Sequence, residues 1–440
     1  MIKVCKFGGT SMADKSAIEQ VKKIILSEPD RRYIVVSAPG KRNKEDIKIT
    51  DTLYKVYDEL VSTGDIKENF LPIQHRFIEI AKELNVKVDI EKILEQVRKE
   101  IIENKDRDFT ASRGEYLTAI IMADYIGYEF VDAAKLIRFD SEGKLNEDYT
   151  NDKVRLVLKD IERAVIPGFY GKNSEGKIKT FSRGGGDITG SIIARGVKAD
   201  LYENWTDVSG FLVCDPRIVP ESKTIKQVTY KELRELSYMG ASVLHSEATF
   251  PVRKERIPIN IKNTFAPSEA GTMIVPNEMY NSGSEEVITG ITGKKGFTVI
   301  VIEKSMMNFE VGFIRKVLSV IEHYGLCVEH VPSGIDTLSV IIESAQLKGG
   351  ILGDIINEIR ESVNPDYVHV VENISLIAIV GHGMTRRIGT AAKIFGALAS
   401  AGINIVMIDQ GSSELNIIIG VSNTDYEKCI RVLYDAFYKK

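Results

Sequence analysis

Short apolar segments alternate with helical patterns over roughly the first 275 residues, and this alternation limits the fold more than any other feature. Strands that alternate with helices form a mostly parallel sheet with helices on both faces. Residues 65–108 are helical and charged throughout, which predicts a helical insertion over the sheet edge. The expected strands are residues 2–7, 33–37, 128–132, 164–167, 199–204 and 257–263, and the expected helices are residues 16–27, 51–62, 114–127, 152–163 and 189–195.

The pattern changes after a polar, turn-rich segment at residues 277–286. Beyond it the order β-α-β-β-α-β occurs twice, which is typical of ferredoxin-like domains. The second copy lacks its last strand, and we expect residues 287–291 to supply it, so that the first copy sits inside the second. The sequence predicts an α/β domain at 1–276, a linker at 277–286 and a doubled domain at 287–440, whose copies span about 297–372 and 373–440 plus 287–291.

Composition excludes several classes of protein. The 440 residues carry a net charge of −4 without a long basic stripe, so neither nucleic acid nor an anionic membrane is an expected partner. Cys5, Cys214, Cys327 and Cys429 are far apart, which indicates reduced thiols and not a disulfide framework or a zinc site. No apolar run approaches the roughly 20 residues of a membrane span, and the N-terminus lacks a signal-peptide layout. We expect a cytoplasmic protein.

The segment Lys6-Phe7-Gly8-Gly9-Thr10-Ser11 follows a predicted strand and precedes a predicted helix. Two glycines let the backbone approach phosphate oxygens, and the helix N-terminus beyond them favours anions. The lysine precedes the glycines, so this is not the Walker sequence. The alternative is a strand lysine followed by a tight turn.

A second glycine cluster, residues 181–191, reads FSRGGGDITGS. Arg183 can grip a carboxylate with two parallel hydrogen bonds, and Asp187 can hold an ammonium group or orient a substrate. The alternative is a glycine turn with Asp187 as helix N-cap, which leaves the three glycines beside an arginine unexplained.

Two further motifs could contribute to a ligand site, the first of them at a strand end, where open α/β sheets bind ligands. Residues 204–210 (NWTDVSG) end a predicted parallel strand, and Asp215-Pro216-Arg217 follows as a phosphate contact or a plain β-turn. Residues 112–115 (SRGE) are interpreted as a helix start. There Glu115 either faces the pocket or complements the helix dipole in the first turn.

Taken together, KFGGTS, SRGE, FSRGGGD, WTDVSGF with DPR, and MGASVLH resemble, in this order, the aspartate kinases of the amino-acid-kinase superfamily. The C-terminal double repeat resembles their tandem ACT domains, and the resemblance covers essentially the whole chain. It implies a carbamate-kinase-like catalytic domain that phosphorylates the β-carboxylate of L-aspartate with MgATP. The products would be 4-phospho-L-aspartate and ADP, in the first step of lysine, threonine and methionine biosynthesis.

The resemblance also implies residue roles. It assigns catalysis to Lys6 and Asp187, and it assigns substrate binding to Ser37, Ala38, Thr50, Glu115, Arg183 and Gly184. ATP binding falls to Lys6, Gly8, Gly9, Thr206, Asp207, Leu212, Asp215, Arg217 and Ser242, and effector binding to Met307, Gly312, Phe313, Glu329, Ser333 and Asp336. Two positions depart from the family: Gly186 replaces a serine, and Ser242 replaces a lysine near the nucleotide phosphates.

The implied reaction agrees with the residues available for it. An aspartate side chain has a pKa near 4, so the nucleophile is already ionised and needs no general base. His245, the one histidine within a motif, is interpreted as structural. The chemistry needs relief of repulsion between a carboxylate and a polyphosphate, which lysine, arginine, backbone N–H groups and Mg²⁺ supply. Asp207 or Asp187 would approach the metal through water.

The sequence allows more than one allosteric effector and more than one function. Acidic Glu329 and Asp336 favour lysine as the allosteric effector, with threonine as the rival, acting on a homodimer or a dimer of dimers joined through the ACT domains. One alternative is a kinase of the same superfamily for glutamate, acetylglutamate or UMP. Another is an amino-acid sensor that has lost catalysis at Ser242. We expect no fused homoserine dehydrogenase, because no G-x-G-x-x-G unit follows the second repeat.

Overall fold

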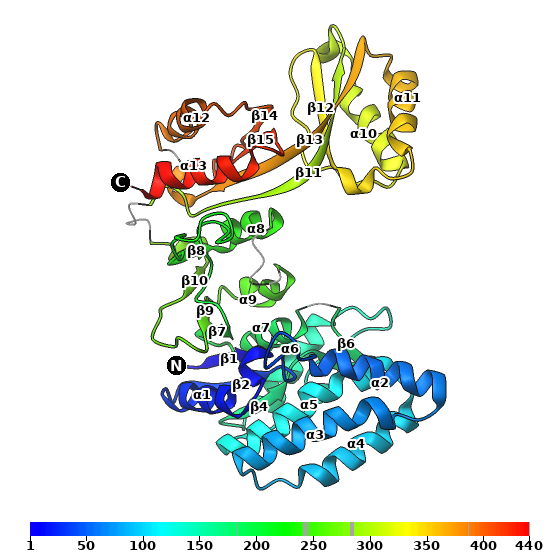
Figure 1. Cartoon of the computed structure of the whole chain (residues 1–440), viewed down its shortest axis with the longest axis vertical. Coiled ribbons are helices and arrows are strands. Elements are labelled where there is room, and N and C mark those ends of the chain that lie inside the picture. The colour runs from blue at the N-terminus through cyan, green and yellow to red at the C-terminus, as the bar shows by residue number, and fades with distance from the viewer. Residues whose placement is uncertain (183, 241–243, 245, 282–285, 386, 440) are drawn as a thin grey trace. The chain divides into compact units, whose positions relative to one another are not determined.

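The computed structural model describes residues 1–182, 184–240, 244, 246–281, 286–385 and 387–439. The chain divides into two compact units (Figure 1). Residues 1–211, 224–233 and 242–280 form the first unit, and residues 212–223, 234–241 and 281–440 form the second. In the described part of the chain, no helix is both long enough and apolar enough to cross a membrane.

An eight-stranded sheet forms the centre of the first unit, in the order β3-β4-β2-β1-β7-β9-β10-β8. Every neighbouring pair is parallel except β9 and β10, which confirms the expected mostly parallel α/β sheet. The short strands β8 and β10 were not expected, because three or four residues are too few to show an alternating pattern. The strands are β1 (Lys3–Phe7), β2 (Arg31–Val36), β3 (Glu129–Phe130), β4 (Ala164–Pro167), β7 (Leu201–Thr206), β8 (Gln227–Thr229), β9 (Ile259–Asn263) and β10 (Thr272–Val275).

Successive side chains of a strand point to opposite faces of this sheet, and helices cover both faces. Cys5 and Phe7 of β1 belong to an apolar core shared with α1 to α5, whereas Lys6 lies on the side of α7. A separate hairpin of β5 (Tyr170–Lys172) and β6 (Ile178–Thr180) joins β4 to α7. The helices are α1 (Lys15–Leu26), α2 (Ile49–Thr63), α3 (Lys67–Leu84), α4 (Ile90–Asn104), α5 (Arg107–Ile126), α6 (Glu147–Leu158), α7 (Gly185–Gly196), α8 (Tyr230–Tyr238) and α9 (Phe250–Lys254).

The charged segment 65–108 forms α3, α4 and the start of α5, as expected from its helical pattern. Helix α3 packs against α1, α2, α4 and α5 (Figure 1). Its apolar side chains Phe70, Ile73 and Phe77 are fully buried. Burial of three such side chains contributes roughly 1.5–3 kcal/mol each before the entropy of ordering is counted. The insertion is therefore an integral layer of the first unit.

Two long antiparallel strands, β11 (Gly290–Glu303) and β13 (Tyr367–Val380), organise the second unit. The first half of β11, residues 290–295, pairs with the second half of β13, so the strand expected at residues 287–291 begins instead at Gly290. We expected separate short strands. Each is instead continuous through a bulge near Gly296 and Asn373, where φ is +92° and +61°.

The remaining elements of this unit follow the doubled β-α-β-β-α-β order except for the second strand of the first repeat. Residues 327–331, expected as a strand, make only an isolated bridge from His330 to Ile341. The five-stranded sheet has the order β12-β11-β13-β15-β14. Its other elements are β12 (Thr337–Glu343), β14 (Met407–Asp409), β15 (Asn416–Ser422), α10 (Phe313–His323), α11 (Ile351–Val363), α12 (Thr390–Ser400) and α13 (Tyr426–Tyr438).

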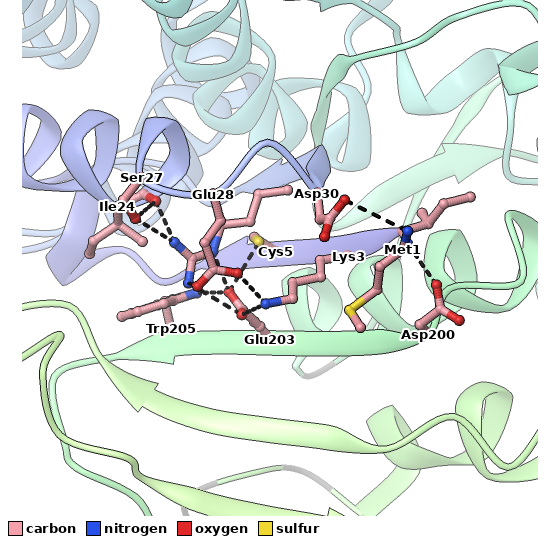
Figure 2. Close-up of polar contacts among 12 residues, drawn as sticks. Met1, Lys3, Cys5, Ile24, Ser27, Glu28, Asp30, Asp200, Glu203 and Trp205 are labelled. Carbon is pink, nitrogen blue, oxygen red and sulfur yellow. Dashed lines mark hydrogen bonds and ion pairs between the residues drawn. The ribbon is translucent and has the colours of Figure 1, made fainter.

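A buried ionic cluster fixes β7 beside β1 (Figure 2). Glu203 of β7 is 2% exposed and accepts hydrogen bonds from Arg31 Nε at 2.8 Å and Trp205 Nε1 at 2.9 Å. The ammonium of Lys3 lies 3.6 Å from Glu203 and also pairs with Glu28. Burial acts to raise the pKa of Glu203, but the Arg31 guanidinium outweighs burial and holds the pKa below its ordinary value.

We expect Arg31→Met to lower the free energy of unfolding by about 3–5 kcal/mol, because it leaves the Glu203 carboxylate buried without its main partner. The matched variant Glu28→Gln, whose side chain is 42% exposed, should cost less than about 1 kcal/mol. Denaturant titration measures both. Adding Glu203→Leu should recover part of the loss, and a double variant less stable than Arg31→Met would contradict this account.

Candidate active site

Lys6 lies at the carboxyl end of β1 with 8% of its surface exposed. Its Nζ is 2.6 Å from Oδ1 of Asp187, in the first turn of α7. Asn204 of β7 donates a hydrogen bond from Nδ2 to the same oxygen at 2.9 Å. The structure therefore brings both predicted catalytic residues together, and a neighbouring strand holds the aspartate in place.

Glycines allow the loops around Lys6 to approach one another. Gly8 N–H donates to the Trp205 carbonyl at 3.0 Å, and Gly40 N–H donates to the Gly9 carbonyl at 2.8 Å. A Cβ on Gly40 would lie 2.6 Å from the Gly9 carbonyl carbon, so the two backbones meet without room for a side chain. The walls beside Lys6 are thus formed by backbone, which suits contact with phosphate oxygens.

Gly186, where the family has serine, lies against the same lysine. A Cβ there would be 3.0 Å from Ser37 Oγ and 3.2 Å from Lys6 Cε. A side chain at this position would require its neighbours to shift by a few tenths of an ångström.

Glu115 reaches the loop after β2 from α5. Helix α5 comes close to this loop because Gly114 lacks a side chain: a Cβ there would lie 2.7 Å from Ala38 Cβ. Glu115 is 6% exposed, and its Oε2 is buried without a hydrogen-bond partner. Burial raises the pKa of this carboxyl to about 8, although backbone hydrogen bonds, including one from Ala38, oppose the shift.

The expectation that SRGE begins a helix is wrong. Helix α5 begins at Arg107, where Asp106 accepts a hydrogen bond from the Phe109 N–H, so Glu115 lies in the third turn and not near the positive end of the dipole. Asp106 is the better N-cap by sequence, but the alternating charges before it concealed the helix start. Similarly, α7 is capped by Gly184, so Asp187 is not its N-cap.

The remaining predicted substrate residues flank these groups. Ser37 and Ala38 follow β2, Thr50 lies in the first turn of α2, and Gly184 adopts a left-handed conformation with φ +57° before α7. A cavity of about 640 Å³ opens beside Ser182 and Ile188, which flank the glycine turn, and Tyr54 lines it one helical turn after Thr50. Arg183 lies outside the described residues.

The predicted nucleotide residues are divided between the two units. Thr10 Oγ1 donates to Asp207 Oδ2 at 3.2 Å, which places the glycine loop beside the end of β7, where Thr206 lies. Leu212, Asp215 and Arg217 belong to the second unit, where the Arg217 side chain is 88% exposed and paired with Asp215 at 2.6 Å. Ser242 and His245 lie outside the described residues.

The described residues contain no group of three or more Asp, Glu, His or Cys side chains that could enclose a metal ion. Mg²⁺ keeps several waters and binds through one or two carboxylates plus substrate phosphates, so such a cage is not required. Asp207 is exposed beside the glycine loop, whereas Asp187 is less exposed and its Oδ1 already contacts Lys6 and Asn204. Asp207 is therefore the carboxylate that fits a nucleotide-bound Mg²⁺.

The predicted effector residues lie in the first repeat of the second unit. Met307 and Phe313 are buried in its core, and Gly312 caps α10 with φ +81°. Asp336 accepts a hydrogen bond from the Met306 N–H at 2.8 Å. Ser333 bridges to Leu338, and Glu329 accepts a hydrogen bond from Tyr238 Oη at 2.6 Å. Asp336 thus fixes the turn before α10, Glu329 contacts α8, and Met307 and Phe313 anchor the turn in the core.

Asn204 is a site residue that the sequence analysis did not assign, although it stands in a quoted motif. Its signal was its place two residues before the end of a buried parallel strand, directly before Trp205. Gly168 was missed as well: a Cβ there would lie 3.0 Å from Gly186 Cα, so it lets the turn after β4 approach the second glycine cluster.

Comparison with known proteins agrees with this geometry. Residues 1–263 match the profile of the amino acid kinase family, and residues 377–437 match that of an ACT domain. Aspartokinase 3 of Bacillus subtilis is 38% identical over 99% of both chains. The chain belongs to the amino acid kinase family, as an aspartate kinase. The predicted family, the fold and the phosphotransferase activity are thereby confirmed.

Solved structures support the same assignment. The crystal structure of the aspartate kinase of Clostridium acetobutylicum, described as an allosteric enzyme, is 51% identical, covers 99% of both chains and has a TM-score of 0.90. Aspartokinase III of E. coli, solved with aspartate and ADP, shares the fold with a TM-score of 0.72 at 23% identity. The similarity to the Clostridium acetobutylicum structure therefore extends over the whole of this aspartate kinase, including its ACT region.

Proposed function

We propose that this aspartate kinase transfers the γ-phosphoryl group of MgATP to the β-carboxylate of L-aspartate, giving 4-phospho-L-aspartate and ADP, in the cleft at the carboxyl ends of β1, β2 and β7. The observation that carries the proposal is the pairing of two features near one edge of the sheet. One is the buried Lys6 ammonium between glycine-rich loops, and the other is the partnerless carboxyl oxygen of Glu115. A cation for phosphate and an acid for an ammonium group are what the two substrates require.

At the phosphoryl end, Lys6 neutralises charge on the transferring group, and Gly8 and Gly9 offer backbone close to it. Asp187 holds the Lys6 Nζ at one point, and Asn204 fixes Asp187 in turn. The β-carboxylate is ionised at neutral pH, so the reaction proceeds without a general base. Preorganisation of Lys6 before substrate binding avoids reorganisation during the transfer.

At the substrate end, Glu115 receives the ammonium group of aspartate, and Arg183 receives its α-carboxylate. Ser37, Ala38, Thr50 and Gly184 line the space between these groups. A carboxyl with a pKa near 8 is mostly neutral at pH 7 and ionises when the ammonium group arrives, so aspartate binding releases a proton.

At the nucleotide end, Thr206 and Asp207 lie beside the glycine loop, and Leu212, Asp215, Arg217 and Ser242 remain the proposed further contacts. Mg²⁺ would supply charge neutralisation to the phosphates when bound, and Asp207 would approach it through water. Asp207 accepts from the Thr10 and Thr206 hydroxyls at 3.2 Å each, so both of its oxygens face polar groups of the cleft.

Aspartate-dependent release of ADP tests the proposed acceptor. We expect release with aspartate and trapping of the acyl phosphate by hydroxylamine, but less than about 1% of that rate with glutamate, because one extra methylene moves the carboxylate away from Lys6. Equal rates with both amino acids would reject aspartate as the acceptor. Mg²⁺ removal by a chelator should stop the reaction.

Feedback control by an amino acid is the second part of the proposal, with lysine as the effector and threonine as the rival. The support is the position of Glu329 and Asp336 at the loops of the first ACT repeat, where acidic groups suit the second ammonium of lysine. The Glu329 carboxylate now holds the Tyr238 hydroxyl, and a lysine ammonium would compete for it. A coupling of about 1–3 kcal/mol is typical for such control.

The same repeat offers a surface for association between copies. Four apolar side chains next to the predicted effector residues are largely exposed: Met306 at 66%, Phe309 at 74%, Val311 at 96% and Ile335 at 70%. Exposed apolar clusters of this kind mark protein interfaces. We propose that they join two copies into a homodimer or a dimer of dimers through the ACT repeats.

We expect millimolar lysine to raise the aspartate KM or lower kcat by about 5- to 100-fold, and to leave a Glu329→Gln variant much less affected. Sedimentation in the same solutions should show a species larger than one 49.0 kDa chain. Threonine serves as the comparison. If threonine alone changes the kinetics, threonine and not lysine is the effector. If neither amino acid changes them, the proposed feedback control is wrong.

A further inference from the structure

Arg76 is a buried arginine to which the sequence assigns no role. It lies in α3, within the helical insertion, and is 6% exposed. Arginine is almost never this deeply buried unless its guanidinium is paired. Its partners therefore indicate what the residue does.

The Arg76 guanidinium reaches two separate loops. Nη2 donates to the carbonyl of Ala13 at 2.8 Å, at the end of the glycine loop, and to the carbonyl of Gly40 at 3.0 Å, in the loop after β2. Nη1 donates to Asp46 Oδ2 at 3.0 Å, farther along that second loop. The planar guanidinium suits this task because its donors point in fixed directions.

Asp46 is itself firmly held. The Arg42 backbone N–H and side-chain Nε each donate to its Oδ2 at 3.0 Å. Burial acts to raise the pKa of Asp46, but the hydrogen bonds from Arg42 and Arg76 prevail and keep the pKa well below its ordinary value. Asp46 is therefore charged at all working pH values and gives Arg76 a permanent anionic partner.

The two loops are the walls of the proposed site. The glycine loop, residues 8–13, is the proposed phosphate wall, and the loop of residues 37–48 carries Ser37 and Ala38 and leads into α2, where Thr50 lies. They touch through backbone at Gly9 and Gly40, and Ser37 N–H donates to the Phe7 carbonyl at 3.2 Å. These contacts lie close to the sheet, so they leave the outer parts of both loops, near Ala13 and Asp46, to be tied by Arg76.

We propose that Arg76 is a positioning residue that holds the phosphate-facing loop and the aspartate-facing loop in one fixed relation. The proposal rests on the proposed roles of these two loops. Transfer in line requires the β-carboxylate and the γ-phosphoryl group to lie about 3–3.5 Å apart and aligned, and a shift of about 1 Å costs about 10²-fold in rate. Each substrate contacts mainly its own loop, so loss of the tie should lower kcat more than it weakens either substrate.

Three variants test this role: Arg76→Met, Arg76→Lys and the control Arg98→Met, whose arginine is 40% exposed on α4 and pairs with Asp65. We expect Arg76→Met to lower kcat by about 30- to 100-fold and to change both KM values by less than about 3-fold. Arg76→Lys should recover little, because one ammonium cannot meet acceptors on two loops in a planar fork. Arg98→Met should match the wild type.

Folding is followed in parallel by thermal unfolding. If Arg76→Met is folded and keeps the wild-type kcat, the proposal is wrong. It is also wrong if the loss of activity equals the unfolded fraction, or if it appears entirely in one KM. For a variant that does not fold, Arg76→Lys at a temperature well below its midpoint gives the same comparison. If the proposed active site itself were wrong, Lys6→Met would retain activity. That result distinguishes failure of the site from failure of the Arg76 proposal.

Discussion

Replacing Lys6 with methionine lowers kcat for aspartate phosphorylation by about 10³-fold or more, by analogy with the loss of one preorganised charge-stabilising donor. Lys6 is a buried cation beside the two glycines of the loop: a Cβ on Gly8 would lie 3.6 Å from its Nζ. Methionine has a similar length but no charge, so the repulsion between the incoming carboxylate and the phosphates would no longer be relieved. The measurement is aspartate-dependent ADP release at saturating substrates.

The control for this result is Lys15→Met, because Lys15 is a surface lysine with a 47% exposed side chain. We expect it to behave as the wild type. The Lys6→Arg variant should also be poor, since Gly8 and Gly186 leave space sized for the lysine and the Asp187 oxygen lies only 2.6 Å from Nζ. A folded Lys6→Met protein within 10-fold of the wild-type rate would contradict the role given to Lys6.

Replacing Glu115 with glutamine raises the aspartate KM by about 100-fold at pH 8, because a neutral amide replaces the carboxylate that receives the ammonium group. The effect should depend on pH. The wild-type carboxyl has a pKa near 8, so it is protonated below that pH and must release its proton before it pairs. The wild-type KM should therefore fall as pH rises from 6 to 8, by up to about 10-fold per unit, and then level off.

The glutamine variant should lose this pH dependence and approach the wild type at pH 6, where both side chains are neutral. Glu103→Gln, on the exposed face of α4, provides the matched control and should leave the KM unchanged. A wild-type KM that is flat between pH 6 and 8, or a Glu115→Gln variant with equal loss at both pH values, would show that Glu115 does not bind the ammonium group.

Residues that chemistry constrains locally could be predicted from the sequence. Lys6, Gly8 and Gly9 stand directly after a strand, and Asp187 stands beside three glycines, so strand ends and glycine turns indicated the site before the fold was known. The doubled pattern of the C-terminal region could be seen because each repeat keeps its strand and helix periods.

Features that depend on contacts distant in sequence could not be predicted. Arg76 looks like a solvated charge on an amphipathic helix, and only the fold reveals that Ala13 and Gly40 approach it. In the sequence, Asn204 is a single polar residue in a strand, and only the structure shows that it donates a hydrogen bond to Asp187. The interpretation of Glu115 as a first-turn acid failed because the start of α5, eight residues earlier at Arg107, is set by Asp106 and not by the SRGE motif.

A structure of the protein with aspartate and a nonhydrolysable ATP analogue tests the central claim most directly. The account predicts the aspartate ammonium at Glu115 Oε2, with the β-carboxylate and the terminal phosphate both beside Lys6 and about 3–3.5 Å from each other. Aspartate bound away from Glu115, or a terminal phosphate that does not approach Lys6, would contradict it.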